Sequence, residues 1–495
     1  MSSELPCYKV SWKNPRFPEI KENSKASGGG CQPGLRSTLK MTFLKGLANP
    51  LVYFIGSLLF YLQAFPQDRQ PADSLQFLTL DQCIVYALKH QPAYLESAIN
   101  VSIARKTNAI SLSGWLPQVS FGGNLTHYDP LPTSFTANPL DPSGSPLPVH
   151  SGITNTFTPQ VNASQAIINP DVLYAARSAH LFVESAMQSS DSTKINLITS
   201  VSKSFFSLLL TLAQMNVLKD DTTRLGKTQR DAYHQYISGV VDKTDYQEAT
   251  ISLNNSRAQL KQAVESVRPL YAILKQLIGL APEKEFNVSY DTNQMMKKIS
   301  IDTNEQLLVE KRIEYQQLQT VKKLQEQNVQ YYRSQYLPAL SAFYNYVYEY
   351  ENNNFSQLLN QSYPYSYMGA SVSIPLFTGL RWHANVQKAK LEMQKTDWQI
   401  TDLKSRIYSE YSTALATYKS NLYNMNVLRE NMIMARDVYG VVSLQYKQGL
   451  IAYLNVITAE SNLISSQISF LNALFQVLSS KVDLEKAMGN TLSKY

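Results

Sequence analysis

The sequence of this 495-residue chain contains an internal duplication, which constrains its fold more than any other feature. Segments that begin near positions 90 and 311 align without gaps, and the Trp-Leu-Pro at residues 115–117 falls on the Tyr-Leu-Pro at residues 336–338. Later in each copy, residues 215–219 read MNVLK and residues 425–429 read MNVLR. The two copies must therefore build the same order of elements twice. We place the first repeat at residues 78–280, a linker at 281–303 and the second repeat at 304–490.

Within each copy the predicted elements follow the same order. A helix comes first and ends at a Leu-Pro pair, because proline cannot continue a helix. An alternating strand, a polar loop and an alternating return strand follow. In the first copy these four elements span residues 80–114, 118–128, 129–154 and 155–167, and in the second they span 304–335, 339–350, 351–362 and 365–376.

The predicted strands have two unlike sides. In the last one, Met368, Ala370 and Val372 are apolar, whereas Gly369 and Ser371 between them are small. Strands of about ten residues with such alternation are typical of a transmembrane β-barrel, although an edge hairpin of a soluble sheet shows the same pattern. Alternating tyrosines in the strand before it fit a membrane-interface belt, stacking within the sheet or a lumen lining: Tyr344, Tyr346, Tyr348 and Tyr350.

Two long tracts without proline, residues 171–238 and 380–447, space their apolar side chains by threes and fours. This spacing is typical of coiled coils and predicts helices of about 100 Å. The expected core positions are Leu197, Val201, Ser204, Leu208, Leu212, Met215, Leu218, Thr222 and Leu225, and then Ile400, Leu403, Ile407, Tyr411, Ala414, Tyr418, Leu422, Met425, Leu428, Met432, Ala435, Tyr439, Val442 and Tyr446. Because Met425 and Met432 are core positions, we interpret them and Met434 as packing residues rather than a metal site.

Each long tract ends in the same Gln-Tyr-x-x-Gly turn, which contains Tyr236 and Gly239 in the first copy and Tyr446 and Gly449 in the second. Some forty residues with helical spacing follow each glycine, so the chain returns as a helical hairpin. Glycine tolerates the positive φ that such a tip needs. We expect the return helices to be capped by Asp242, Thr244 and Asp245 in the first copy and by Asn455 in the second.

Four strands per chain imply an oligomer. The smallest closed transmembrane barrels use eight strands, and lipid does not tolerate open sheet edges. A dimer would give eight strands and no lumen, whereas a trimer gives twelve. The predicted fold class is therefore an α+β membrane protein, a trimeric 12-stranded barrel continued by an α-helical coiled-coil tunnel, with an internal duplication.

The first 64 residues have the composition of a leader. Residues 41–64 combine Lys45 with an apolar run and end at Ala64, which fits a secretory signal peptide, and a retained signal anchor is the alternative. Residues 1–40 are polar and glycine-rich, which suggests a start codon placed too early. Cys7 and Cys31 fall in this leader, so the mature chain keeps Cys83 alone and has no intramolecular disulfide. No cysteine lies where a lipid anchor would need it.

The chain carries none of the sequence patterns of an enzyme. No nucleophile triad, phosphate loop or His/Cys cluster is present, and the six histidines lack metal-ligand spacing. We therefore expect no catalytic residues, no metal and no cofactor. Most of the net charge of +7 lies in the leader, so the near-neutral remainder gives no electrostatic reason to bind nucleic acid.

Three further segments resemble the TolC-like outer-membrane efflux protein family. They read LTLDQCIVYALKHQPAY from residue 78, SIPLFTGLRWHANVQKAK from residue 373 and QYKQGLIAYLNVITAESNL from residue 445. The resemblance covers residues 78–490 and implies a homotrimer in the outer membrane of a Gram-negative bacterium, with a large periplasmic part. It also implies two partners, a periplasmic adaptor and an inner-membrane transporter, and passive export of small molecules. The outer channel of a type I protein secretion system is the alternative, and a periplasmic coiled-coil scaffold is the alternative from another class.

The resemblance also assigns roles to the turns. It puts Tyr236, Gly239, Tyr446 and Gly449 at the periplasmic aperture and adaptor contact. Family members often carry carboxylates just after the second turn, where this chain has Asn455 and Thr458. An aperture latch or pore ring is therefore expected to be neutral or to use the first copy: Asp242, Asp245 or Glu248. For each of these three, a plain solvated position is the alternative.

Overall fold

The computed structural model describes residues 77–137, 145–288, 296, 299–301 and 306–492. The chain divides into two units, Met1–Asp73 and Ser74–Tyr495, and every described element belongs to the second. The signal peptide at residues 41–64, the suspected early start at residues 1–40, Cys7 and Cys31 lie outside the described residues. Predictions about them stay predictions.

One antiparallel sheet combines the strands of both copies. Its order is β2 (Gln118–His127), β5 (Asn155–Ile168), β7 (Ala339–Asn352) and β8 (Ser362–Ser373). The first three agree with prediction to within two residues. The fourth lies three residues earlier than predicted, because Pro375 has no N–H to donate to a ladder and the strand ends before it.

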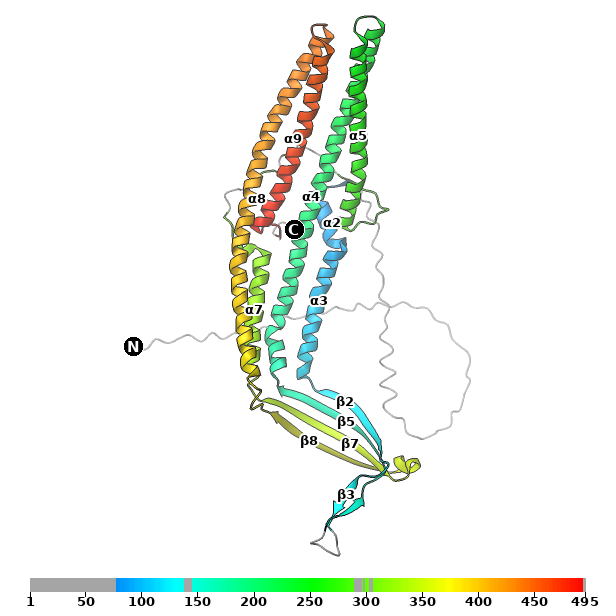
Figure 1. The fold of residues 1–495 in the computed structure, drawn as a ribbon, viewed down its shortest axis with the longest axis vertical. Coiled ribbons are helices and arrows are strands. Elements are labelled where there is room, and N and C mark those ends of the chain that lie inside the picture. Colours follow the sequence, from blue (N-terminus) through cyan, green and yellow to red (C-terminus); the bar gives the residue numbers. More distant parts are fainter. Residues whose placement is uncertain (1–76, 138–144, 289–295, 297–298, 302–305, 493–495) are drawn as a thin grey trace, which may run out of the picture. The chain divides into compact units, whose positions relative to one another are not determined.

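Helices continue the strands in the same lateral order. α3 (Pro92–Leu112) packs on α4 (Pro170–Ile237), α4 on α7 (Ile313–Ser334), and α7 on α8 (Arg381–Lys447). Figure 1 shows all four meeting the sheet at one end of the helical layer. α4 has 68 residues and α8 has 67, so each is about 100 Å long.

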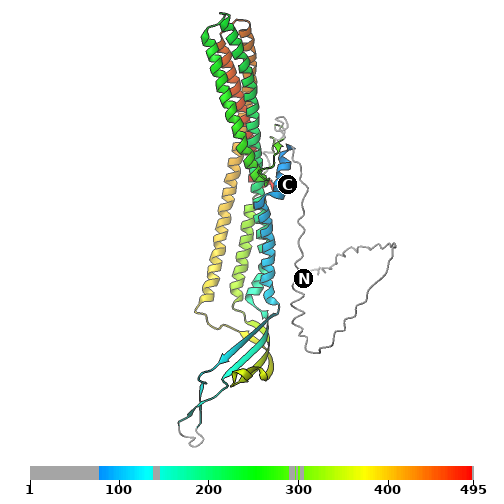
Figure 2. The same cartoon turned by 90° about the vertical axis from the view of Figure 1, so that its right-hand side faces the viewer.

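At the other end of the layer, two return helices complete two hairpins. α5 (Lys243–Ile278) packs back along α4, and α9 (Tyr453–Met488) packs back along α8. α4 also contacts α9, so the α4/α5 hairpin and the α8/α9 hairpin lie side by side. Figure 2 shows these hairpins continuing beyond α3 and α7, which end part-way along the layer.

The helix predicted over residues 80–114 is wrong in one respect, since the structure contains two helices there. α2 (Leu80–His90) begins with a capping box in which Thr79 and Gln82 exchange hydrogen bonds, and it ends at Gln91. Gln91 is extended (ψ 118°) because Pro92 follows it and begins α3. In the second copy α7 begins only at Ile313, after a short 3₁₀ helix (Val309–Lys311).

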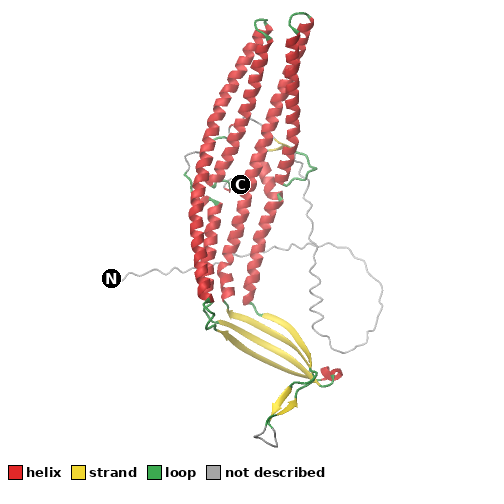
Figure 3. Cartoon of the chain, viewed as in Figure 1, coloured by secondary structure: helices red, strands yellow, loops and turns green. Residues whose placement is uncertain are grey.

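The predicted polar loops contain regular structure of their own. Within the first loop, β3 (Thr133–Thr136) pairs with β4 (Leu147–His150) to extend the β2–β5 connection as a hairpin (Figure 3). The second loop holds a 3₁₀ helix at Phe355–Asn360. A short parallel pair, β1 (Phe77–Leu78) with β6 (Asn287–Val288), ties the beginning of the first repeat to the segment after α5.

The main core lies where the two copies meet, and it includes the fully buried Val201, Leu208, Leu274, Val477 and Leu484. All the predicted core positions of α4 and α8 are buried or partly buried, which confirms the coiled-coil spacing. Met434 is exposed, in keeping with its place outside that pattern. Among the described helices, α4 alone is long and apolar enough to cross a bilayer, but 56% of its apolar window is buried inside the protein, as in a core helix.

Candidate functional site

The two hairpin tips have nearly identical backbones. Gly239 and Gly449 both have a φ of +74°, and each donates its N–H to the carbonyl of the tyrosine three residues earlier, at 3.0 Å for Tyr236 and 2.9 Å for Tyr446. No atom lies within 4 Å of the Cβ that a larger residue would add at either glycine. The positive φ, rather than crowding, therefore selects glycine at both tips.

Of the predicted caps of the return helices, Asp242 takes the N-cap position of α5, whereas Thr244, Asp245 and Asn455 lie inside the helices. The N-cap positions are Asp242 for α5 and Ala452 for α9, and neither side chain makes a cap hydrogen bond. Asn455 lies one turn too late, inside α9, where its N–H bonds to the Ala452 carbonyl at 3.1 Å. The chain enters both helices through backbone turns alone, so the side chains around the tips remain available for other contacts.

The two turn tyrosines do different things. Tyr236 stacks on Tyr246 of its own hairpin, with ring centroids 6.3 Å apart. Tyr446 instead reaches the other hairpin, and its hydroxyl donates to Gln235 Oε1 at 2.9 Å. Burial, followed by the charges of Asp245 and Asp231, raises the pKa of Tyr446. Tyr446 therefore links the two hairpins one turn from the tip.

The other predicted aperture residues do not gather at one place within the chain. Asp245 and Glu248 are half-buried on α5, whereas Asp242, Asn455 and Thr458 are exposed. The Thr458 hydroxyl donates to the Leu454 carbonyl of its own helix at 2.9 Å. Asp245 is the one of these five whose charge helps to raise the pKa of Tyr446.

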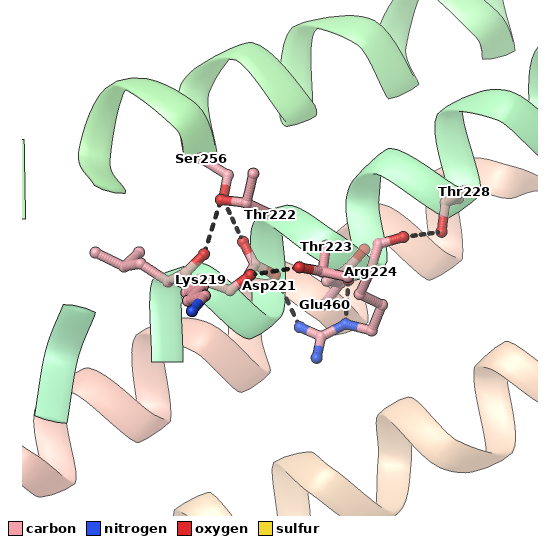
Figure 4. Close-up of polar contacts among 9 residues, drawn as sticks. Lys219, Asp221, Thr222, Thr223, Arg224, Thr228, Ser256 and Glu460 are labelled. Carbon is pink, nitrogen blue, oxygen red and sulfur yellow. Dashed lines mark hydrogen bonds and ion pairs between the residues drawn. The ribbon is translucent and has the colours of Figure 1, made fainter. Parts of the chain in front are cut away.

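Sequence reasoning missed a buried charge cluster between the two hairpins, shown in Figure 4. Arg224 of α4 donates from Nε to Glu460 Oε1 at 2.5 Å and from Nη2 to Asp221 Oδ1 at 2.8 Å. The second oxygen of Asp221 accepts from the Ser256 hydroxyl of α5, also at 2.8 Å. The guanidinium lies over the ring of Tyr439 on α8, 5.1 Å from its centroid. All four helices of the two hairpins thus contribute to one cluster.

Both carboxylates of this cluster are almost out of reach of water. The side chains of Asp221 and Glu460 are each 2% exposed, against 31% for Arg224. Burial raises the pKa of Glu460 and of Asp221 by more than Arg224 lowers them. The sequence does contain one signal for this site, because Glu460 is the lone charged residue between Tyr453 and Lys481 of α9.

The cluster is one of five side-chain links that the described residues make between the hairpins. The other four are Lys486 Nζ to Asn196 Oδ1 at 2.9 Å, Lys203 Nζ to Asp483 Oδ1 at 2.6 Å, Gln214 Nε2 to Asn472 Oδ1 at 2.9 Å, and the Tyr446–Gln235 bond. From Lys203 to Gln235 the α4 members recur about every three helical turns, which returns each to the face that meets the α8/α9 hairpin. Lys203 and Asp483 are 38% and 45% exposed, so of the two ion pairs among these links the Arg224 one is buried.

The register of the sheet places most of its apolar side chains on one face and most of its polar side chains on the other. Residues directly opposite each other in antiparallel strands point to the same side. One face carries Val119, Phe121, Leu125, Phe157, Val161, Ala163, Leu340, Tyr344, Tyr346, Tyr348, Tyr350, Met368 and Val372. The other carries Ser120, Asn124, Thr156, Thr158, Gln160, Asn162, Ser341, Asn345, Ser371 and the aromatic residues Phe343, Tyr363, Tyr365 and Tyr367.

The apolar face of the sheet is uncovered. Phe121 is 77% exposed and Met368 is 82% exposed. Within the described part of the chain, β2 and β8 each pair on one side only, so both edges of the sheet are free. An apolar face and two open edges are unfavourable in water, so neither is explained by a single chain in solution.

The described residues contain neither a metal-binding cluster nor a reactive thiol. No group of three or more His, Cys, Asp or Glu side chains there is placed to hold a metal ion. Cys83 is buried in the main core, and burial raises the pKa of its thiol to about 12, so it is an unreactive packing residue.

Comparison with known proteins identifies this architecture. The sequence profile described as outer membrane efflux protein matches residues 83–280 and 310–490. The chain belongs to the outer membrane efflux protein family. Members of this family are outer-membrane channels that work with an inner-membrane pump and a periplasmic adaptor. The comparison with curated proteins finds no match.

Solved structures with the same fold are channels of this family. The outer membrane protein VceC of Vibrio cholerae is 17% identical, with 83% of this chain and 96% of that one covered and a TM-score of 0.64. The CmeC outer membrane channel of Campylobacter jejuni is 16% identical, with 86% and 91% covered and a TM-score of 0.64. The MtrE outer membrane channel of Neisseria gonorrhoeae, solved in an open state, is 17% identical, with 86% and 95% covered and a TM-score of 0.65.

Proposed function

We propose that three copies of this chain form an outer-membrane duct that exports small molecules passively, with energy supplied by an inner-membrane transporter through a periplasmic adaptor. The observation that carries the proposal is the sheet, which has one uncovered apolar face and two free edges. In lipid every backbone group must be paired, so β8 of one copy has to pair with β2 of the next. Three copies of four strands give a closed barrel of twelve, wide enough for a lumen.

The helices at the two edges of the chain support the same closure. α3 and α8 lie outermost in the layer, directly above β2 and β8. Each presents exposed apolar side chains at helical spacing, which are Ile99, Ile103 and Ile110 on α3 and Leu391, Trp398 and Tyr408 on α8. When β8 pairs with a neighbouring β2, α8 meets the neighbouring α3, so these side chains become mutual partners.

In such a barrel the apolar face of the sheet meets lipid and the polar face lines the lumen. The tyrosines at residues 344–350 then face lipid, which favours the membrane belt over the lumen lining. The polar face with Asn162, Asn345 and Ser371 makes a wet wall that suits passage of polar and charged molecules.

The hairpin tips are the proposed adaptor contact. Ile237, Val240, Leu450 and Leu454 flank the two glycines and are exposed, which leaves apolar side chains at the far end of the tunnel. We assign Tyr236, Gly239, Tyr446 and Gly449 to this contact. Asp245 joins the latch through Tyr446, while Asp242, Glu248, Asn455 and Thr458 are proposed pore positions. The aperture is then built unequally from the two repeats.

Membrane fractionation and planar-bilayer recording test the proposal. The full chain should fractionate with the outer membrane, migrate as a heat-sensitive trimer and give single-channel currents. Asp245→Ala should raise the conductance by loosening the aperture, whereas Asp191→Ala, at a position far from both tips, should not change it. A protein recovered from the soluble periplasm would identify a coiled-coil scaffold and overturn the duct.

A further inference from the structure

The charge cluster of Asp221, Arg224 and Glu460 has one more carboxylate than it can neutralise. Both carboxylates are buried and share a single guanidinium, so full ionisation leaves one unbalanced negative charge among four packed helices. An uncompensated buried charge is strongly destabilising, and a carboxyl group in that situation takes up a proton. Burial has the same consequence for Glu460, whose pKa it raises.

The hydrogen-bond partners of the two carboxylates indicate which oxygen takes up the proton. Asp221 has a donor at each oxygen, one from Arg224 and one from Ser256. Glu460 accepts from Arg224 at Oε1, but its Oε2 is buried and has no hydrogen-bond partner among the described residues. An ionised carboxylate loses more from an unpaired buried oxygen than a protonated carboxyl does. Of the carboxylate oxygens in the cluster, Glu460 Oε2 is therefore the one whose protonation has the lowest free-energy cost.

The surroundings add no compensating cation. Apart from the three members themselves, the titratable groups that interact with the cluster are Tyr439 from α8 and Tyr453 from α9. Tyr453 is buried, its hydroxyl has no partner among the described residues, and the charge of Glu460 helps to raise its pKa. Among the described residues, Arg224 is thus the one positive charge that acts on both carboxylates.

We propose that Asp221, Arg224 and Glu460 form a proton-responsive lock, in which a protonated Glu460 holds the α4/α5 and α8/α9 hairpins together and its deprotonation releases them. The proposal rests on the proposed duct, in which the hairpins surround the periplasmic end of the tunnel. It differs from the latch at Tyr446, which lies one turn from the tip and whose bond to Gln235 is neutral.

The direction of the pH effect follows from the proton balance. A carboxyl whose pKa is higher in the packed state than in the released state binds its proton more tightly when packed. The packing is therefore strongest at low pH and weakens as the pH rises through the pKa of Glu460 in the closed state. One proton per chain changes the ratio of closed to open hairpins by at most about tenfold per pH unit.

Two substitutions remove the titration by different routes. Glu460→Gln is neutral and nearly isosteric, so it mimics the protonated state. Asp221→Asn leaves Arg224 and Glu460 as a balanced pair that needs no proton. The matched control is Asp483→Asn, which alters the exposed ion pair with Lys203 between the same two helices.

The experiment records planar-bilayer conductance and the melting temperature (Tm) of the purified full-length protein from pH 4.5 to pH 8.5. Wild type and Asp483→Asn should show rising open probability and falling Tm as the pH rises. Glu460→Gln and Asp221→Asn should hold the low-pH values throughout and lose the slope of up to about tenfold per pH unit. Either variant is sufficient if the other does not fold.

Three outcomes overturn the lock. Variants that keep the wild-type slope in both readouts exclude Glu460 as the titrating group. A slope that disappears from Tm but not from conductance makes the cluster a stabilising contact and not a gate. Absence of current from every protein, including wild type, refutes the proposed duct itself, and the Tm profiles distinguish that failure from the other two.

Discussion

The sheet and the helical hairpins distribute their apolar side chains in opposite ways. Around α4 the apolar residues turn inward, so that Leu208 and Val201 are fully buried. In the sheet they turn outward, and Phe121 and Met368 are largely exposed. The same chain therefore follows the rule for a protein in water over its helices and the rule for a protein in lipid over its strands. In the proposed duct, the membrane boundary lies where the helices meet the sheet.

The comparison is tested most severely in the helical core. Leu208→Ala should cost about 2–5 kcal/mol of folding free energy, because it opens a cavity in a fully buried site. The midpoint of urea unfolding in detergent measures the loss. Met187→Ala on the same helix is the control, since Met187 is half-exposed and should change stability by less than about 0.5 kcal/mol. Equal losses at both positions would contradict the inward-facing core.

The sheet gives the reciprocal test at two adjacent residues. Val161→Arg puts a charge on the apolar face near the middle of β5 and should cost about 2–4 kcal/mol if that face meets lipid. Asn162→Arg puts the same charge on the polar face and should be tolerated. The yield of trimer in the outer-membrane fraction measures both. A greater loss for Asn162→Arg would reverse the assignment of the two faces.

Two glycines nine residues apart sharpen the comparison of helix and tip. Gly440 lies on an exposed face inside α8 with no atom within 4 Å of an added Cβ, so Gly440→Ala should stabilise the helix by about 1 kcal/mol. Gly449 has a φ of +74°, so Gly449→Ala should destabilise the tip by about 1–2 kcal/mol. Thermal unfolding of the two variants should therefore shift in opposite directions, and shifts of the same sign would refute the tip geometry.

The smallest expected effect separates the two turn tyrosines. Tyr446→Phe removes the hydrogen bond to Gln235 and should weaken the contact between hairpins by about 0.5–1.5 kcal/mol, which appears as more frequent channel opening. Tyr236→Phe keeps the ring stacked on Tyr246 and should leave opening unchanged. If Tyr236→Phe opened the channel as much, the latch would not be specific to the second copy.

Many elements of this fold are determined by local periodicity of the sequence, and these elements were predictable. The alternation of the strands and the three-and-four spacing around Leu208 and Tyr418 are read from neighbouring residues, and the duplication checks each against its copy. The break between α2 and α3 was also legible in principle, since Pro92 disfavours a helical Gln91. It was missed because the helical pattern continues on both sides.

The parts that could not be predicted depend on distant partners. Arg224 and Glu460 lie in different copies, and no spacing rule connects a residue of α4 with one of α9. Comparison of the two copies does not reveal the cluster either, because the corresponding positions of the other copy carry other residues. The mistaken cap at Asn455 has a different, local origin, since the first turn of α9 is fixed by backbone bonds rather than by a side chain.

The ends of the return helices α5 and α9 meet the beginnings of the short helices α3 and α7 without a covalent connection. Gly279, which ends α5, abuts His90 and Gln91 at the start of α3, and Gly489, which ends α9, abuts Lys311 just before α7. An added Cβ at Gly279 would come within 2.5 Å of the His90 carbonyl oxygen, so the two backbones are in direct contact. Four helical rods run from the sheet toward the tips. Two of them are continuous polypeptide, and each of the other two consists of two helices that meet end to end without a covalent bond. A twisting force applied at the tips is carried along α4 and α8 by covalent bonds, whereas along the other two rods it has to cross a non-covalent junction.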